Sequence, residues 1–110
     1  MKKRKFKQVF DNGKYVYSRF LIAYVIKDLE KSNDVGIIVS KKIGNSVVRH
    51  RYTRLIREAC RLNLDKYVQG YSFVIISKKS IIGKSYHEIE KDLLKIISYI
   101  NNEKSINKTN

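Results

Sequence analysis

Residues 41 to 61, KKIGNSVVRHRYTRLIREACR, concentrate side chains that bind phosphate. The segment holds seven Lys and Arg residues and a single acid, Glu58. Arg is the commoner of the two, and its planar guanidinium pairs bidentately with phosphate and stacks on bases, whereas Lys offers a point charge. The pattern therefore indicates recognition of a polyanion rather than nucleophilic or acid-base catalysis.

A helix over residues 46 to 61 would give this charge a direction. At about 100° per residue, one arc of the wheel carries the apolar side chains. These are Val48, Tyr52, Leu55, Ile56 and Ala59. The opposite side carries a set that we name the basic ridge: His50, Arg51, Arg54, Arg57 and Arg61. Like charges at these spacings cost an isolated helix about 0.2 to 0.5 kcal/mol per pair, which Glu58 offsets only in part.

The residues before this helix add further phosphate ligands. Gly44, Asn45 and Ser46 supply a turn, cap residues and backbone N–H groups at the positive end of the helix dipole. Lys41 and Lys42 precede them directly. The alternative is an ordinary basic surface helix, but the one-sided charge and the excess of Arg favour a nucleic-acid footprint.

The composition supports a folded, strongly basic chain. The 110 residues carry a net charge of +14, with 43% hydrophobic and 11% aromatic residues. Such a charge is typical of proteins whose partner is a polyanion. The length predicts one domain over residues 1–100, which the charge marks as nucleic-acid-binding, followed by a frayed, flexible tail at 101–110. With Cys60 as the only cysteine and no long apolar run, we expect a cytoplasmic protein without a disulfide.

Periodicity predicts the elements that position the basic segment. A short helix carries Phe6, Val9 and Phe10 on one face and stops at Asn12-Gly13, where glycine suits a left-handed cap. Three apolar runs, at 19–28, 35–40 and 71–77, are typical of strands. A last helix begins with Ser85 and Glu88 at capping-box spacing and continues with apolar residues at helical spacing.

No catalytic or metal-binding constellation is evident. The ten carboxylates are scattered, and His50 and His87 have no clear catalytic partner. Glu88, Glu90 and Asp92 spread around the last helix, where they suit its N-terminal dipole. We therefore assign neither a catalytic residue nor a metal ligand, and we expect Cys60 to be a small buried hydrophobe.

The segment SKKIGNSVVRHRYTRLIREACR closely resembles the signature of the bacterial ribonuclease P protein subunit. In that family a strand ends in Ser-Lys-Lys, a Gly-Asn turn follows, and a helix carries Arg-Asn-Arg and further arginines. KFKQVFDNG resembles the first helix of the family, and the spacing from Gly13 to Tyr24 fits its first long strand. The resemblance covers roughly residues 2–100.

The resemblance implies an α+β fold, a two-layer α/β sandwich in the order α-β-β-(β)-α-β-α. It also implies a left-handed strand-helix-strand crossover, although physical considerations alone favour the right-handed form. The implied function is that of an accessory subunit. It would bind the catalytic ribonuclease P RNA and the 5′ leader of precursor tRNA. The RNA subunit would hold the Mg²⁺ ions and catalyse endonucleolytic removal of the leader, so the protein itself would have no intrinsic cofactor, small-molecule substrate or membrane partner.

The resemblance also assigns residues. Those matching the RNA-docking motif, together with the other members of the basic ridge, are Lys41, Lys42, Asn45, Arg49, His50, Arg51, Arg54, Arg57 and Arg61. Those expected to line the leader cleft are Phe6, Phe10, Tyr24, Arg49 and Thr53. His50 replaces the usual central Asn of the motif, and Thr53 replaces a common Lys or Arg.

The aromatic assignments have structural alternatives. Phe6 and Phe10 lie four residues apart on an amphipathic helix, a spacing that usually marks core residues. Tyr24 alternates with Ile22 and Ile26, so a strand face could bury it, and His50 could be a solvated first-turn residue. The alternative functions are a pure binding module, such as a ribosomal or DNA-binding protein, and a nuclease that acts alone. A helix-turn-helix DNA reader would need a helix where VGIIVSKK predicts a strand.

Overall fold

The computed structural model of the protein is built around a four-stranded mixed sheet. The structure describes residues 2–27, 34–67 and 70–109, with the backbone alone at 65–67 and 103–109. The strands are β1 (Lys14–Tyr17), β2 (Leu21–Lys27), β3 (Val35–Ile38) and β4 (Tyr71–Ser77). They lie in the order β1-β2-β4-β3, and only β3 and β4 pair in parallel.

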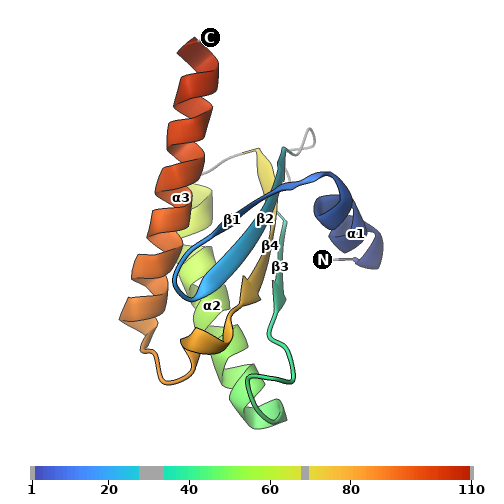
Figure 1. The fold of residues 1–110 in the computed structure, drawn as a ribbon, viewed down its shortest axis with the longest axis vertical. Helices are drawn as coiled ribbons and strands as arrows, with labels where there is room; N and C mark the ends of the chain where they lie inside the picture. Colours follow the sequence, from blue (N-terminus) through green and yellow to red (C-terminus); the bar gives the residue numbers. More distant parts are fainter. Residues whose placement is uncertain (1, 28–33, 68–69, 110) are drawn as a thin grey trace.

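The helices lie on both sides of this sheet. α1 (Lys3–Asn12) packs on one face, whereas α2 (Ser46–Tyr67) and α3 (Tyr86–Thr109) pack on the other (Figure 1). A short 3₁₀ turn, η1 (Lys79–Ile81), follows β4. The order is α-β-β-β-α-β-α, so the predicted α+β class and element order are confirmed. The left-handed crossover through α2 stays a prediction from the resemblance.

The main core lies between the sheet and the helices α2 and α3. Along β2 the side chains of Leu21, Ala23 and Val25 are buried in it, while the alternate residues face α1. α2 contributes Tyr52, Ile56, Ala59, Cys60 and Leu64. Val48 and Leu55 pack against this core at its border, so the predicted apolar arc is confirmed.

α1 is held on the other face by Val9, which is fully buried. The predicted stop at Gly13 is confirmed, but its reason is different. Gly13 has φ −80°, so it does not adopt the left-handed conformation. A Cβ there would lie 2.5 Å from the carbonyl oxygen of Val9 and 2.8 Å from that of Val25. Glycine is therefore required because the helix end and β2 approach each other closely.

Two segments differ from the sequence expectations. The strand predicted at 19–28 is confirmed as β2. The long strand to which the resemblance fitted the spacing from Gly13 to Tyr24 is divided into β1 and β2, because the chain turns at Ser18, whose N–H donates to the carbonyl oxygen of Leu21 over 2.8 Å. β1 and β2 then pair as a hairpin, with Tyr15 opposite Tyr24. α3 continues to Thr109, so the backbone is helical across most of the segment predicted to be frayed. Extending an existing helix avoids the cost of nucleating a new one.

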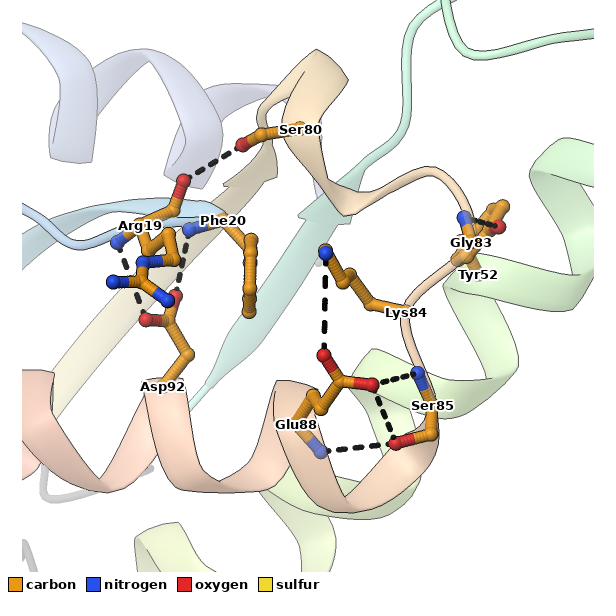
Figure 2. A network of polar contacts seen from close by, with 9 residues as sticks. All are labelled: Arg19, Phe20, Tyr52, Ser80, Gly83, Lys84, Ser85, Glu88 and Asp92. Carbon is orange, nitrogen blue, oxygen red and sulfur yellow. Dashed lines mark hydrogen bonds and ion pairs between the residues drawn. The ribbon is translucent and has the colours of Figure 1, made fainter.

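A polar network fixes the start of α3 against the sheet (Figure 2). The capping box is confirmed, because Ser85 Oγ accepts from the N–H of Glu88, and Glu88 Oε1 accepts from the N–H of Ser85. One turn later the buried carboxylate of Asp92 accepts hydrogen bonds from Ser18 Oγ and from the backbone N–H groups of Arg19 and Phe20. The assignment of Asp92 to the helix dipole was wrong; it anchors α3 to the β1–β2 turn.

Candidate nucleic-acid interface

The N-terminus of α2 has the features of an anion-binding site. Asn45 precedes the helix, and its Oδ1 accepts from the N–H of Val48 over 3.0 Å, a side-chain cap. The first turn contains no acidic residue. Lys41 and Lys42 are exposed in the turn just before it. Because the side-chain oxygen of Asn45 is engaged in the cap, its amide nitrogen is the group that can meet a phosphate.

The basic ridge is exposed along α2, as predicted for all five of its members. Arg61 is bound to Glu58 by two hydrogen bonds, the shorter of 2.6 Å from Nη2 to Oε1. This contact lowers the pKa of Glu58 and raises that of Arg61. Within the ranges that the structure describes, Arg61 is the one ridge residue in an ion pair. The positive charge of Arg51, Arg54 and Arg57 is therefore available to a partner.

Part of the ridge borders a hollow between α2 and the start of α3. Its volume is about 500 Å³. His50, Arg51 and Arg54 line one side, and Tyr86 contributes from α3. The pKa of Tyr86 is raised to about 12 by its burial and by its hydrogen bond to Glu90, so its phenol stays neutral. The carboxylate of Glu58 also lines the hollow, but it is paired with Arg61. The hollow thus presents three nitrogen-rich side chains, and the one acid on its wall is already engaged by an arginine.

Arg49 and Thr53 lie on the less exposed flank of α2. The hydroxyl of Thr53 donates to the carbonyl oxygen of Arg49 over 2.8 Å, so its proton is engaged within the helix. Arg49 is half-buried, and its Nε is covered without a hydrogen-bond partner among the described residues. Both residues lie on α2, which packs on the face of the sheet opposite α1. The structure therefore does not place them beside the aromatic residues that were predicted to line the same cleft.

The aromatic residues predicted for the cleft lie between α1 and the sheet. The rings of Phe10 and Tyr24 meet edge to face, with centroids 4.8 Å apart and planes at 71°. Phe10 is 36% exposed, Tyr24 and Phe6 are half-buried, and the fully buried anchor of the helix is Val9. Phe10 and Tyr24 are therefore brought together at the surface, whereas Phe6 lies one turn earlier on α1, outside this ring pair.

Tyr15 and Tyr17 extend this aromatic surface and are not among the site residues predicted from the sequence. The ring of Tyr15 lies 5.9 Å from that of Tyr24 and 6.3 Å from that of Tyr17. Lys78 Nζ sits 4.8 Å from the centroid of the Tyr17 ring. The signal was the alternation Lys-Tyr-Val-Tyr-Ser, which places both rings on one face of a strand.

Carboxylates near the start of α3 are engaged with protein groups. Glu90 accepts from Asn63 Nδ2 over 3.0 Å and from the Tyr86 hydroxyl over 2.9 Å. Asp92 holds the β1–β2 turn, and Glu88 completes the capping box. Among the described residues no three His, Cys, Asp or Glu side chains gather to hold a metal ion. Nor does any described helix have the length and apolar character needed to span a membrane.

Comparison with known proteins assigns the chain to a family. The family model described as Ribonuclease P matches residues 1–101. The chain belongs to the ribonuclease P protein family. A relative named "Ribonuclease P protein component" from Clostridium botulinum (strain Loch Maree / Type A3) is 42% identical over 97 residues, 87% of each chain. One of the same name from Lachnoclostridium phytofermentans is 45% identical over 91 residues, 83% of this chain and 78% of the relative.

Solved structures in the ribonuclease P family share the fold. The RNase P protein of Staphylococcus aureus superposes with a TM-score of 0.82 over 91% of this chain and 92% of its own, at 24% identity. That of Thermotoga maritima gives 0.79 over 86% and 90%, at 23% identity. The family and the names of its members support a role as a ribonuclease P protein component, part of a ribonucleoprotein of tRNA processing.

Proposed function

We propose that this protein is the accessory subunit of ribonuclease P, which binds the catalytic RNA through α2 and the 5′ leader of precursor tRNA through the cleft beside α1. The observation that carries the proposal is the basic ridge, in which Arg51, Arg54 and Arg57 are exposed on α2 and form no ion pair within the described part of the protein, whereas Arg61 is paired with Glu58. The assembled enzyme acts on RNA in the cytoplasm.

The RNA-subunit contact uses the capped end of α2. Lys41 and Lys42 place ammonium groups beside the helix N-terminus, where backbone N–H groups and the dipole favour a phosphate. His50, Arg51 and Arg54 continue the positive surface around the hollow, and Arg57 extends it along the helix. The Nε of Arg49 lacks a hydrogen-bond partner among the described residues, which suits a side chain that is completed by RNA.

The leader contact uses aromatic stacking. Phe10 and Tyr24 form an edge-to-face pair at the surface, so a base can stack on the exposed ring without displacing a core residue. Stacking of this kind is worth about 1 to 3 kcal/mol per base and tolerates any base. That tolerance suits an enzyme that processes many different precursors.

The hydrolytic chemistry is assigned to the RNA subunit. Mg²⁺ bound there would activate the water and stabilise the charge that develops on the phosphate. The described carboxylates of the protein do not fit a magnesium site, because those that lie closest together in sequence accept hydrogen bonds from neighbouring protein groups. The protein contributes binding energy and position, with no nucleophile and no general base of its own.

The leader assignment is tested with the reconstituted holoenzyme. We expect Phe10→Ala and Tyr24→Ala each to weaken precursor binding about five-fold or more while the affinity for mature tRNA stays unchanged. Tyr99→Ala is the matched control, because Tyr99 is an exposed aromatic residue on α3. Equal losses for precursor and mature tRNA would remove the leader-cleft assignment.

A further inference from the structure

The edge strand β1 carries two exposed aromatic rings that face the same side of the sheet as the cleft. Tyr15 is 63% exposed and Tyr17 is 66% exposed, whereas Val16 between them packs against the core. Two large rings that stay mostly exposed bury little surface in the fold, and a contiguous exposed aromatic patch is typical of an interaction site. Their position therefore indicates a surface that binds something.

The two rings continue the aromatic pair of the cleft. Tyr15 lies directly opposite Tyr24 in the β1–β2 register, and their centroids are 5.9 Å apart. Tyr17 follows at 6.3 Å from Tyr15, with the ring planes within 24° of each other. Phe10, Tyr24, Tyr15 and Tyr17 thus form one uninterrupted series of rings from the end of α1 to the end of β1.

The ammonium group of Lys78 lies at the outer end of this series of rings. Lys78 Nζ lies 4.8 Å from the Tyr17 ring and donates a hydrogen bond of 2.7 Å to the carbonyl oxygen of Ser18. An ammonium group has three donors, so its charge and remaining hydrogens can meet a phosphate. Aromatic rings followed by a fixed cation match the alternation of bases and phosphates in a single strand.

We propose that Tyr15, Tyr17 and Lys78 form a second stacking platform that binds the part of the single-stranded leader beyond the Phe10–Tyr24 cleft. The proposal rests on the leader cleft proposed above and deepens it. The occupant is single-stranded RNA because the rings are flat, nearly parallel and flanked by positive charge, on a chain with a net charge of +14. The platform makes the affinity for a precursor depend on the length of its leader.

The test uses holoenzyme and precursors whose leaders are lengthened one nucleotide at a time. For the wild type, affinity should rise in two stages, the first from the cleft and the second from the platform. Tyr15→Thr/Tyr17→Thr should remove the second stage, a loss of about five-fold or more, and leave short-leader precursor and mature tRNA unaffected. Threonine keeps the strand propensity of β1.

Two variants separate this proposal from the one on which it depends. Phe10→Ala should weaken every precursor with a leader, and Tyr99→Ala should weaken none. Wild-type affinity of Tyr15→Thr/Tyr17→Thr for long leaders, with Phe10→Ala still impaired, would overturn the platform alone. No effect of Phe10→Ala on any precursor would overturn the cleft itself.

A second readout does not depend on affinity. Iodouridine placed at successive leader positions should crosslink to Tyr15 or Tyr17 only from positions beyond those that crosslink to Tyr24. Crosslinks that never reach β1 would contradict the platform. A change in the oligomeric state of the holoenzyme in Tyr15→Thr/Tyr17→Thr, without a change in long-leader affinity, would assign β1 to protein contact and overturn the proposal.

Discussion

At the scale of single residues, the environment of each side chain separates binding groups from structural ones. Arg51 and Arg54 are exposed beside a hollow, whereas Arg61 has the same residue type but is paired with Glu58. Asn45 is a motif residue whose oxygen caps α2. The sequence motif alone assigns all of these residues to RNA binding. Their local contacts show that some are available to a partner and others are engaged within the protein.

Replacing two ridge residues should weaken RNA binding in a salt-dependent way. We expect Arg51→Ala/Arg54→Ala to bind the RNA subunit more weakly and to lower the slope of log affinity against log salt by about one per lost phosphate contact. Lys91→Ala/Lys95→Ala, on the exposed side of α3, is the control with the same loss of charge. An unchanged slope would show that the ridge does not contact phosphate.

The single thiol should be inert in the folded protein. Cys60 is 4% exposed, and burial raises the pKa of its thiol to about 12. Since the thiolate is the reactive form, we expect almost no alkylation by iodoacetamide at pH 8 under native conditions and rapid alkylation in urea. Mass spectrometry of samples taken over time would measure this, and rapid native labelling would contradict the assignment of Cys60 to the core.

At the scale of elements, the contacts between α3 and its neighbours position both candidate surfaces. Asp92 fixes α3 to the turn that leads from β1 into β2, and Glu90 links α3 to Asn63 of α2. Neither contact was predicted, because the residues lie 72 and 27 positions apart in sequence. Periodicity shows which face of a helix is apolar, but it does not show which buried backbone group a carboxylate will meet.

Removing the charge of Asp92 should destabilise the fold. The carboxylate is 2% exposed and accepts from the N–H groups of Arg19 and Phe20. In Asp92→Asn the side-chain NH₂ would replace one carboxylate oxygen and would face the N–H and O–H donors that now bind it. We therefore expect Asp92→Asn to lose about 2 to 4 kcal/mol of unfolding free energy. Urea denaturation measures the loss, with the exposed Asp11→Asn as control. A loss below about 0.5 kcal/mol would contradict the anchoring role.

The contact of Glu90 should make stability depend on pH. Hydrogen bonds from Asn63 and Tyr86 lower the pKa of Glu90 below its ordinary value of 4.5. The stabilisation is therefore complete above pH 4.5 and is lost as the pH falls through the lowered pKa in the folded protein. We expect Glu90→Gln to flatten the acid side of a plot of thermal unfolding temperature against pH. A parallel curve, merely shifted down, would contradict this assignment.

At the scale of the whole molecule, the sheet separates the two proposed RNA contacts. α1 lies on one face of the sheet and α2 on the other (Figure 1). The aromatic series is on the α1 face, and the basic ridge is on α2. One protein can therefore hold the RNA subunit and a leader at the same time. The net charge of +14, costly for an isolated chain, suits a protein that lies between two polyanions.

The sequence predicted the helices and strands of the molecule better than its polar contacts. The basic ridge and the buried arc of α2 were accessible because a helix repeats every 3.6 residues. The hairpin of β1 with β2 and the exposed tyrosines were not, because a four-residue strand gives a weak periodic signal. The close approach that requires Gly13 depends on tertiary packing, so no local rule reveals it.

The most direct test of the central claim is cleavage of a 5′-labelled precursor tRNA at near-physiological Mg²⁺. The protein alone, the cognate ribonuclease P RNA alone and the mixture of both are compared. We expect efficient release of the leader at the mature 5′ end only by the mixture. Cleavage by the protein alone would mean that it carries catalytic residues of its own, and no gain over a competent RNA would reduce it to a binding module.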